Sequence, residues 1–571
     1  MKKEVIVSTV IQYKQRSNHE HQPRWDRTRR AALLDQYHDL HTQGFSLRQA
    51  AKALEVPRST LQAWRAYQES LDAHPAVVAF FHSSPGLAFL HRLVLGIHLV
   101  CTEIGACGIR LVCLLLQLTG LDRVVGASYG TQPQVNRQVE EAIVAYRREE
   151  SARLAQDMPA KAITLTKDAT FTGGLCLGAT EPVSHYIVLE QAAHARDHDT
   201  WQRLMEQALA GLNCQGIQAT SDAAPGLLAY VEPHLGAHHA PDLFHGHHEL
   251  VKGVSGALAI KQRAARKAAA EAQALLAQRQ EQLHNRSQAP AKRRPGRPPK
   301  APASLEQAAQ TAEATSREDQ RLAAQRETVA RSIRAIGHAY HFVDVERGVR
   351  RNGKLIARDI QAQIDPVRTV AHQEGLSQTC LARIEKAERM VPKMQATIAF
   401  VSGYVQQQVR QLALAPPASY AMHALLIPSF SLERVAHTRT VSGGEPLRAL
   451  ATRLRTSLFE PGGVFAELSP TAQGQLTQQA KTLAEVFQRS RSNVEGRNGY
   501  LALRNHQLRG LEHPRKRECL TAVHNFCLTR ADGTTAAERF FGQTPRSMFA
   551  AILASVDIPP APLSPPQRAV G

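Results

Sequence analysis

The strongest constraint on the fold is a short stretch of β-type sequence within a chain whose pattern is otherwise helical. After Pro159, three short apolar runs are separated by turn residues, an amphipathic segment follows from Asp199 to Ala210, and a fourth short run comes next. The four runs span residues 162–166, 174–179, 185–189 and 217–220. The pattern therefore predicts three strands, a helix and a fourth strand.

Two aspartates stand where the first and fourth of these strands are expected to end. Asp168 follows the first run and Asp222 follows the fourth. Three strands, a helix and a strand is the chain order of a ribonuclease H-like mixed sheet with flanking helices, in which the first and fourth strands are neighbours. Both carboxylates would then face the same point. In the simpler alternative, Asp168 caps a turn and Asp222 caps the helix that follows it.

Carboxylates gathered in this way suit phosphodiester chemistry. Two Mg²⁺ ions roughly 3.5 to 4 Å apart stabilise both the attacking and the leaving oxygen, and Mg²⁺ prefers oxygen ligands. The best third carboxylate is Glu495, which lies among small, polar and basic residues in the stretch 487–501. As an alternative, Ser492-x-x-Glu495 also fits a capping box, in which Glu495 would bind a backbone N–H and do no chemistry.

The stretch 487–501, with Leu503, His506 and 509–511 after it, resembles the glutamate motif of bacterial insertion-sequence DDE transposases. The likeness extends from about residue 80 to residue 550. Other segments similar to that family are Thr166–Thr170, Ser221–Asp222, Asp242–His245, His524–Phe526 and Asp532–Gly542.

The resemblance implies a ribonuclease H-like catalytic domain interrupted by a helical insertion. It also implies DNA cleavage and strand transfer at element ends, with Asp168, Asp222 and Glu495 as ligands of two Mg²⁺ or Mn²⁺ ions. One departure stands out. The family pattern has an acidic residue directly after the first aspartate, and this chain has Ala169 there.

Residues 24–68 carry two helical patterns separated by a turn, and the segment 46–65 resembles a helix-turn-helix. Small Ala50 and Ala51 allow two helices to cross closely, and Pro57 suits the start of the second helix. The exposed start of that helix is expected to contact DNA. The alternative is a helical hairpin that packs against its own protein. The predicted DNA contacts are Arg58, Ser59, Thr60 and Gln62.

The net charge also favours a nucleic-acid partner. Lys and Arg number 69 against 50 Asp and Glu, which gives a formal charge of +19, and a polyanion is the natural partner of such a chain. The eight cysteines form no Cys-x-x-Cys pair, which argues against a disulfide framework and a zinc ribbon. The first residues carry no signal-peptide core, so a cytoplasmic, nucleoid-associated protein is expected.

The apolar stretch from Leu87 to Leu121 is interrupted by charged residues and histidines every few positions, which predicts buried helices and no membrane partner. Two further basic sites are expected to contact DNA: Arg497, and the tract Lys292–Lys300, which resembles an AT-hook with Arg294 and Arg297 in a minor groove. The alternative for the tract is a basic linker. Asp242 is a reserve catalytic carboxylate.

A dense group of histidines surrounds Asp242, and imidazoles at such spacings can bind zinc. A more ordinary interpretation places His238 and His239 on a fifth strand and His245 near the acidic site. The histidines are His234, His238, His239, His245, His247 and His248.

The predicted fold class is multidomain α/β plus α, with an N-terminal helix-turn-helix, a ribonuclease H-like mixed sheet and a large all-α insertion. Helices are expected at 254–284 and 304–335, as a hairpin, and at 356–364, 377–404 and 445–458. The predicted domains are 1–75, the helix-turn-helix; 76–158, a helical DNA-binding or dimerisation region; 159–250 and 481–552, the two parts of the catalytic domain; 251–480, the insertion, with a basic linker at 290–301; and 553–571, a disordered tail.

The expected partner is double-stranded DNA, both element ends and target. A homodimer or higher oligomer is expected because two ends must be brought together. Two alternatives remain open at this stage: a non-catalytic helix-turn-helix regulator, and a decayed transposase that binds DNA without cutting it.

Overall fold

The computed structural model describes residues 27–69, 74–171, 173–222, 224–288, 302–508 and 511–562. These residues are mostly helical and contain one five-stranded mixed sheet. The predicted combination of one mixed sheet with many helices is confirmed. The chain divides into two compact units, the first made of residues 1–152, 506–528 and 544–571 and the second of residues 153–505 and 529–543.

The first unit begins with three helices, α1 (Arg27–Thr42), α2 (Leu47–Ala53) and α3 (Arg58–Glu69). Ser46 caps α2 in a capping box with Gln49. The turn between α2 and α3 passes through Glu55, whose φ of 53° is left-handed. The three helices share a small core of Leu34, Tyr37, Ala50, Ala51, Val56 and Leu61.

The rest of the first unit is helical as well. Residues 84–104 form the one helix in the described ranges that is long and apolar enough to cross a membrane, a test that the core helix of a soluble protein also passes. Its Glu103 is buried and bound by Lys516 Nζ at 2.7 Å. The elements are α4 (Pro75–His82), α5 (Ser84–Ile97), the π-helical turn η1 (His98–Ile104), α6 (Ile109–Leu118), the 3-10 turn η2 (Leu121–Arg123), most of α7 (Gln132–Gln156), α21 (Pro514–Phe526) and α23 (Met548–Ser555).

The sheet of the second unit has the strand order β3-β2-β1-β4-β5. β1 pairs antiparallel with β2, and β2 antiparallel with β3, whereas β1, β4 and β5 run parallel. The prediction that the first and fourth strands are neighbours is confirmed, as is a fifth strand at His238 and His239. The strands are β1 (Lys161–Thr170), β2 (Cys176–Glu181), β3 (Tyr186–Ala192), β4 (Cys214–Ser221) and β5 (His238–Pro241).

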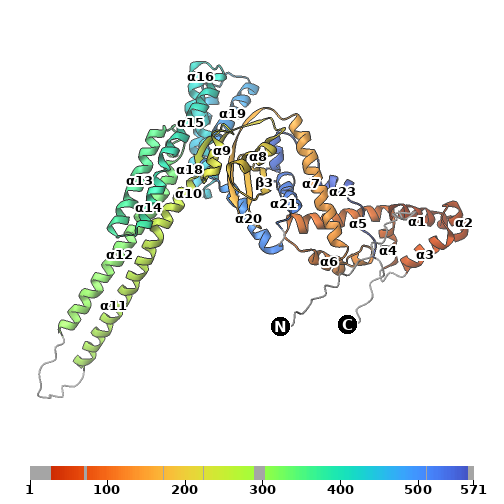
Figure 1. Ribbon diagram of the computed structural model, residues 1–571, viewed down its shortest axis with the longest axis horizontal. Coiled ribbons are helices and arrows are strands. Elements are labelled where there is room, and N and C mark those ends of the chain that lie inside the picture. Colours follow the sequence, from red (N-terminus) through yellow and green to blue (C-terminus); the bar gives the residue numbers. More distant parts are fainter. Residues whose placement is uncertain are drawn as a thin grey trace, which may run out of the picture. The chain divides into compact units, whose positions relative to one another are not determined.

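Side chains alternate between the two faces of β1. Lys167 points to the face covered by α8 (His198–Leu209) and α9 (Pro225–Val231) (Figure 1), where its Nζ lies 4.3 Å from the centre of the Tyr230 ring. This amine is buried without a hydrogen-bond partner, and burial lowers the pKa of Lys167 to about 7. Asp168 points to the opposite face, toward α10 (Leu243–Leu250) and α20 (Ser492–Leu508). α22 (Ala536–Phe541) packs beside β3, where Phe540 stacks on Tyr186.

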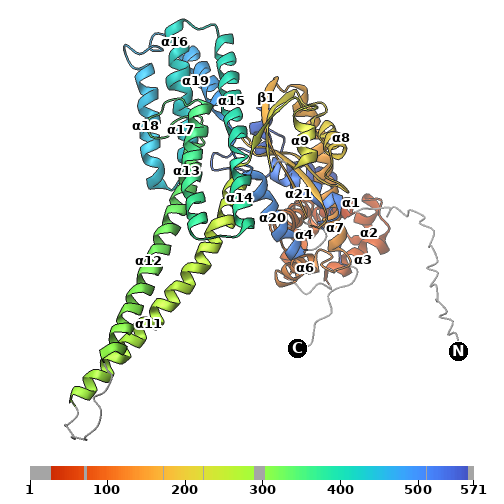
Figure 2. The same cartoon turned by 60° about the vertical axis from the view of Figure 1, so that its left-hand side comes forward.

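A large helical insertion separates α10 from α20, as predicted. Its two longest helices, α11 and α12, form a hairpin (Figure 2), and the others gather at one end of it around a common apolar core. The elements are η3 (Val251–Ser255), α11 (Gly256–Gln288), α12 (Pro302–Ala339), α13 (Gly353–Gln373), α14 (Gln378–Glu388), α15 (Val391–Gln411), α16 (Pro416–Ala421), η4 (Met422–Leu426), α17 (Ile427–His437), α18 (Val441–Phe459) and α19 (Pro470–Glu485).

The single helix expected over residues 377–404 is wrong, because the chain forms α14 and α15 there. Pro392 lies in the first turn of α15. A proline there has no N–H to donate to the preceding turn. The chain breaks before it, at Arg389 and Met390.

Candidate functional site

The sheet places Asp168 and Asp222 level with each other. β1 and β4 pair in parallel as far as Thr166 and Thr220, and each aspartate comes two residues later in the chain. Asp222 directly follows β4, as predicted. The expected strand end before Asp168 is wrong, because β1 continues to Thr170 and pairs Asp168 with Gly178 of β2.

The segment before α20 is tied to the same edge of the sheet. Gln218 Nε2 on β4 donates to the carbonyl oxygen of Gln488 at 2.8 Å. The backbone N–H of Leu243 donates to Arg489 O at 2.9 Å, and Arg489 Nη1 donates in turn to Gly337 O, near the end of α12, at 2.6 Å. α20 therefore starts beside the carboxyl ends of β1 and β4, although the insertion lies between them in the chain.

Arg491, the last residue before α20, lies at the centre of four carboxylates. Its Nη1 contacts Asp168 and lies 3.9 Å from Asp222 Oδ2. Its Nη2 lies 3.0 Å from Glu495 Oε1. Its Nε binds Asp242 Oδ2 at 3.1 Å, and its backbone N–H donates to Asp242 Oδ1 at 3.4 Å. The structure thus brings the three predicted catalytic carboxylates around one guanidinium.

The four carboxylates differ in exposure. The side chain of Asp242 is fully buried and that of Asp168 is 12% exposed, whereas Asp222 and Glu495 are 33% and 35% exposed. Burial raises the pKa of Asp168 to about 6, and the neighbouring Arg491 guanidinium opposes the rise. Burial also raises the pKa of Asp242. Four formal negative charges face one positive charge, which leaves an excess of negative charge on the solvent side.

Asp242 does not belong with the solvent-side carboxylates. It caps α10 by accepting from the Phe244 N–H, and it holds both the side chain and the backbone of Arg491. A fully buried carboxylate with these partners positions other groups. The sequence placed it in reserve as a catalytic residue, and the structure shows it as an anchor for the start of α20.

The capping-box alternative for Glu495 does not fit the helix start. α20 begins at Ser492, so Ser492 is the first helical residue and Arg491 precedes it. The Glu495 carboxylate pairs with Arg491 across one turn.

Two neighbouring residues on α20 have roles that the sequence did not reveal. Asn498 Nδ2 donates to Asp168 Oδ2 at 2.7 Å. The expectation that Arg497 contacts DNA is corrected: its side chain is 8% exposed, and its guanidinium donates two hydrogen bonds to Glu190, at 2.8 and 2.7 Å. A pair that is already closed and buried is not available to a phosphate.

Some of the other expected DNA contacts lie within the described residues and some lie outside them. At the start of α3, Arg58, Ser59 and Gln62 are exposed and Thr60 is half-buried. The AT-hook-like tract, with Arg294 and Arg297, lies outside the described residues.

The histidines around Asp242 are dispersed among different partners. His239 Nε2 lies 2.9 Å from Ser221 Oγ, and His238 Nε2 lies 3.0 Å from Thr397 Oγ1. His245 lies 3.5 Å from Glu249. In the described ranges no three His, Cys, Asp or Glu side chains are placed to share a metal ion.

The described acidic residues also form no group of three that is placed to share a metal ion. The guanidinium of Arg491 occupies the place among them. Asp168, Asp222 and Glu495 all approach Arg491, whose guanidinium lies between them. Their chemistry, three carboxylates with oxygen donors only, fits Mg²⁺ or Mn²⁺, and Arg491 shows that the place they surround holds positive charge. The terminal nitrogens of Arg491 would have to leave these oxygens before a divalent cation could bind there.

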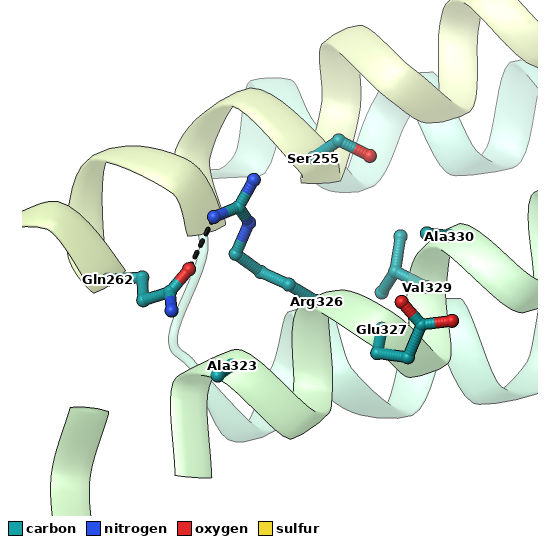
Figure 3. Close-up of a pocket in the computed structure, with 7 residues that line it drawn as sticks. All are labelled: Ser255, Gln262, Ala323, Arg326, Glu327, Val329 and Ala330. Carbon is teal, nitrogen blue, oxygen red and sulfur yellow. Dashed lines mark hydrogen bonds between the residues drawn. The ribbon is translucent and has the colours of Figure 1, made fainter. Parts of the chain in front are cut away.

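A separate cavity of about 270 Å³ lies between the two helices of the hairpin, where they meet η3 (Figure 3). Arg326 reaches across it toward Gln262, and Glu327 is also on its wall. None of the four clustered carboxylates lines it. We assign it no role in the chemistry.

A family model matches residues 422–568, which is less than half of the chain; it is described as a family of unknown function, DUF6399. The match includes Arg491, Glu495 and Asn498 but neither Asp168 nor Asp222. No curated protein and no solved structure matches the chain.

Proposed function

We propose that the chain is a DNA transposase of the DDE type, related to those of bacterial insertion sequences. It cuts and rejoins DNA strands at element ends with two Mg²⁺ or Mn²⁺ ions held by Asp168, Asp222 and Glu495. One observation carries the proposal: these three carboxylates converge on a single guanidinium, although 273 positions separate Asp222 from Glu495.

The strand order supports it. A sheet in the order β3-β2-β1-β4-β5, with two antiparallel pairs and two parallel pairs, is the ribonuclease H-like arrangement. Asp168 lies two residues before the end of β1, and Asp222 directly follows β4. In open sheets of this kind, ligands bind outside the carboxyl ends of the strands.

The proposed roles of the four acidic residues follow from how deeply each side chain is buried. Bound divalent ions supply the positive charge that stabilises the attacking and leaving oxygens. Asp168 is oriented from inside by the Asn498 amide. Asp222 and Glu495 are the more exposed members and face the side from which a phosphate arrives. Asp242 is not proposed as a metal ligand; through its bonds to Arg491 it fixes the start of α20.

Ala169 does not weaken this ligand set. Neighbouring side chains on a strand point to opposite faces, so an acidic side chain at position 169 would lie on the face of Lys167, away from Asp168. The departure from the family pattern therefore removes no carboxylate from the cluster.

The helices α1–α3 support DNA binding. α2 and α3, with the turn between them, have the form of a helix-turn-helix, and their shared core leaves Arg58, Ser59 and Gln62 exposed at the start of α3. Such a helix start reads base edges in the major groove. We propose that this part binds double-stranded element ends in a cytoplasmic, nucleoid-associated protein that acts as a homodimer or higher oligomer.

The presence of Arg491 favours one second candidate. This candidate is a decayed or repurposed transposase that binds DNA without cutting it. The cluster around the Arg491 guanidinium is already a set of ion pairs, and such a protein would retain these ion pairs. The two candidate functions differ in one outcome: the active transposase nicks DNA when divalent cations are added, and the non-catalytic protein does not.

The deciding experiment is a nicking and strand-transfer assay on DNA carrying the element's own ends, with and without Mg²⁺. Asp168→Asn, Asp222→Asn and Glu495→Gln are each expected to lower the rate by at least about a hundredfold while end binding in a gel shift persists. Metal-independent binding with no nicking by the wild-type chain would establish the non-catalytic candidate.

Arg58→Ala is the reciprocal variant. It should weaken end binding by roughly 1 to 3 kcal/mol, and its folded carboxylate cluster should be unchanged. Unaltered end binding by Arg58→Ala would contradict the helix-turn-helix assignment without affecting the catalytic one.

A further inference from the structure

Arg491 is the resident cation of the acidic site. Its side chain is 11% exposed, and among the described residues it is the one cation in salt-bridge contact with Asp168, Asp222, Asp242 or Glu495. The carboxylates of Asp168, Asp222 and Glu495 repel one another unless a cation lies among them. In the metal-free chain, that cation is the guanidinium.

The contacts of Arg491 fall into two sets. Nε and the backbone N–H are held by the fully buried Asp242. The terminal nitrogens Nη1 and Nη2 contact the three proposed ligands. The backbone bond to Asp242 does not depend on the side-chain rotamer, so the terminal nitrogens can leave the ligands while the start of α20 stays anchored.

We propose that Arg491 is a positioning residue that keeps the acidic site assembled before metal binds and competes with divalent cations for Asp168, Asp222 and Glu495. The inference rests on the proposed function, since it concerns the same site. A metal ion that enters must break the contacts of Nη1 and Nη2, and the cost of breaking them lowers the affinity of the free protein for the ion.

The guanidinium suits this role better than an ammonium would. Its planar fork offers several donors in fixed directions, and here they reach Asp168, Glu495 and Asp242 at once. A lysine at position 491 would offer one point charge on a flexible stem. This lysine should still compete in part with divalent cations for the three carboxylates, but it should do little to hold those carboxylates in position.

The test is Mn²⁺ binding by isothermal titration calorimetry to the full chain after treatment with a chelator. Arg491→Gln is expected to bind Mn²⁺ about tenfold more tightly than the wild type, which corresponds to about 1.4 kcal/mol. Arg491→Lys should fall between the two. Arg266→Gln, which removes one exposed charge from α11, is the matched control and should bind as the wild type does.

Unfolding temperature gives a second readout that does not depend on activity. Without metal, Arg491→Gln should unfold at a lower temperature than the wild type, and saturating Mn²⁺ should raise its unfolding temperature by more than it raises that of the wild type. If Arg491→Gln does not fold, Arg491→Lys serves for both measurements.

The outcomes separate the inference from the proposed function. If the wild type binds Mn²⁺ and Arg491→Gln binds equally or more weakly, the competition is refuted and the metal-dependent function stands. If neither protein binds Mn²⁺, the inference and the two-metal function are refuted together.

Discussion

Arg491 and Arg497 are six residues apart at the start of α20, and both are bound to carboxylates, but in opposite ways. Arg497 is buried against one partner, Glu190, through two parallel hydrogen bonds. Arg491 faces four carboxylates, two of them a third exposed. One pair is balanced in charge and closed to solvent, whereas the other cluster has more negative charge than its arginine neutralises.

The difference separates a structural ion pair from a site that can bind further cations. A buried, balanced pair has its interactions satisfied within the protein, and removing one partner leaves an unpaired buried charge. An unbalanced cluster near the surface has capacity left for ions from solution. Charge balance and exposure, more than the presence of an arginine, distinguish the two.

The largest expected effect on stability is at the ion pair between Arg497 and Glu190. Arg497→Met should lower the free energy of unfolding by about 3 to 5 kcal/mol, because the buried Glu190 carboxylate loses both hydrogen bonds from the guanidinium. Urea denaturation measures it, with and without Mg²⁺. Replacing both residues by Met should restore most of the loss, and rescue of the single variant by Mg²⁺ would remove the distinction between the two arginines.

An intermediate effect is expected where α20 supports the cluster. Asn498→Ala removes the amide hydrogen bond to Asp168 and should cost about 1.5 to 3 kcal/mol, the range for a hydrogen bond to a charged group. The same denaturation measures it. Asn498→Asp, which adds a fifth carboxylate to the cluster, should cost more without Mg²⁺ and regain stability when Mg²⁺ is added; the reverse order would contradict the excess of negative charge.

The smallest effect on stability is expected at Glu495. Its carboxylate is 35% exposed, and ion pairs of this kind contribute about 0 to 1 kcal/mol. Glu495→Gln should therefore change the free energy of unfolding by no more than about 1 kcal/mol, although it is expected to abolish nicking. A loss as large as that of Arg497→Met would mean that Glu495 serves the fold.

The sequence predicted most of the sheet and the members of the cluster, because both leave local signals. Alternating apolar runs and turn residues mark strands, and Asp168 and Asp222 stand close to strand ends. Arg491 and Asn498 leave no such signal. An arginine in a basic chain has no distinguishing pattern, and its role depends on Gln488 and Arg489, whose backbone is bound by β4 and α10. Arg497 was misassigned for the same reason, since its partner Glu190 is distant in the chain.

The helices α11 and α12 have 33 and 38 residues, which makes each of them roughly 50 Å long or more. The near end of this hairpin is bonded to the segment that carries Arg491, since Arg489 donates to the carbonyl oxygens of Gly337 and Tyr340. A rigid rod fixed at one end acts as a lever. A rotation of about 5° at the base would move the far end by about 4 Å over that length. The near end also packs against η3 and α13, so a load applied to the far end of the hairpin would be shared between those elements and the segment that carries Arg491.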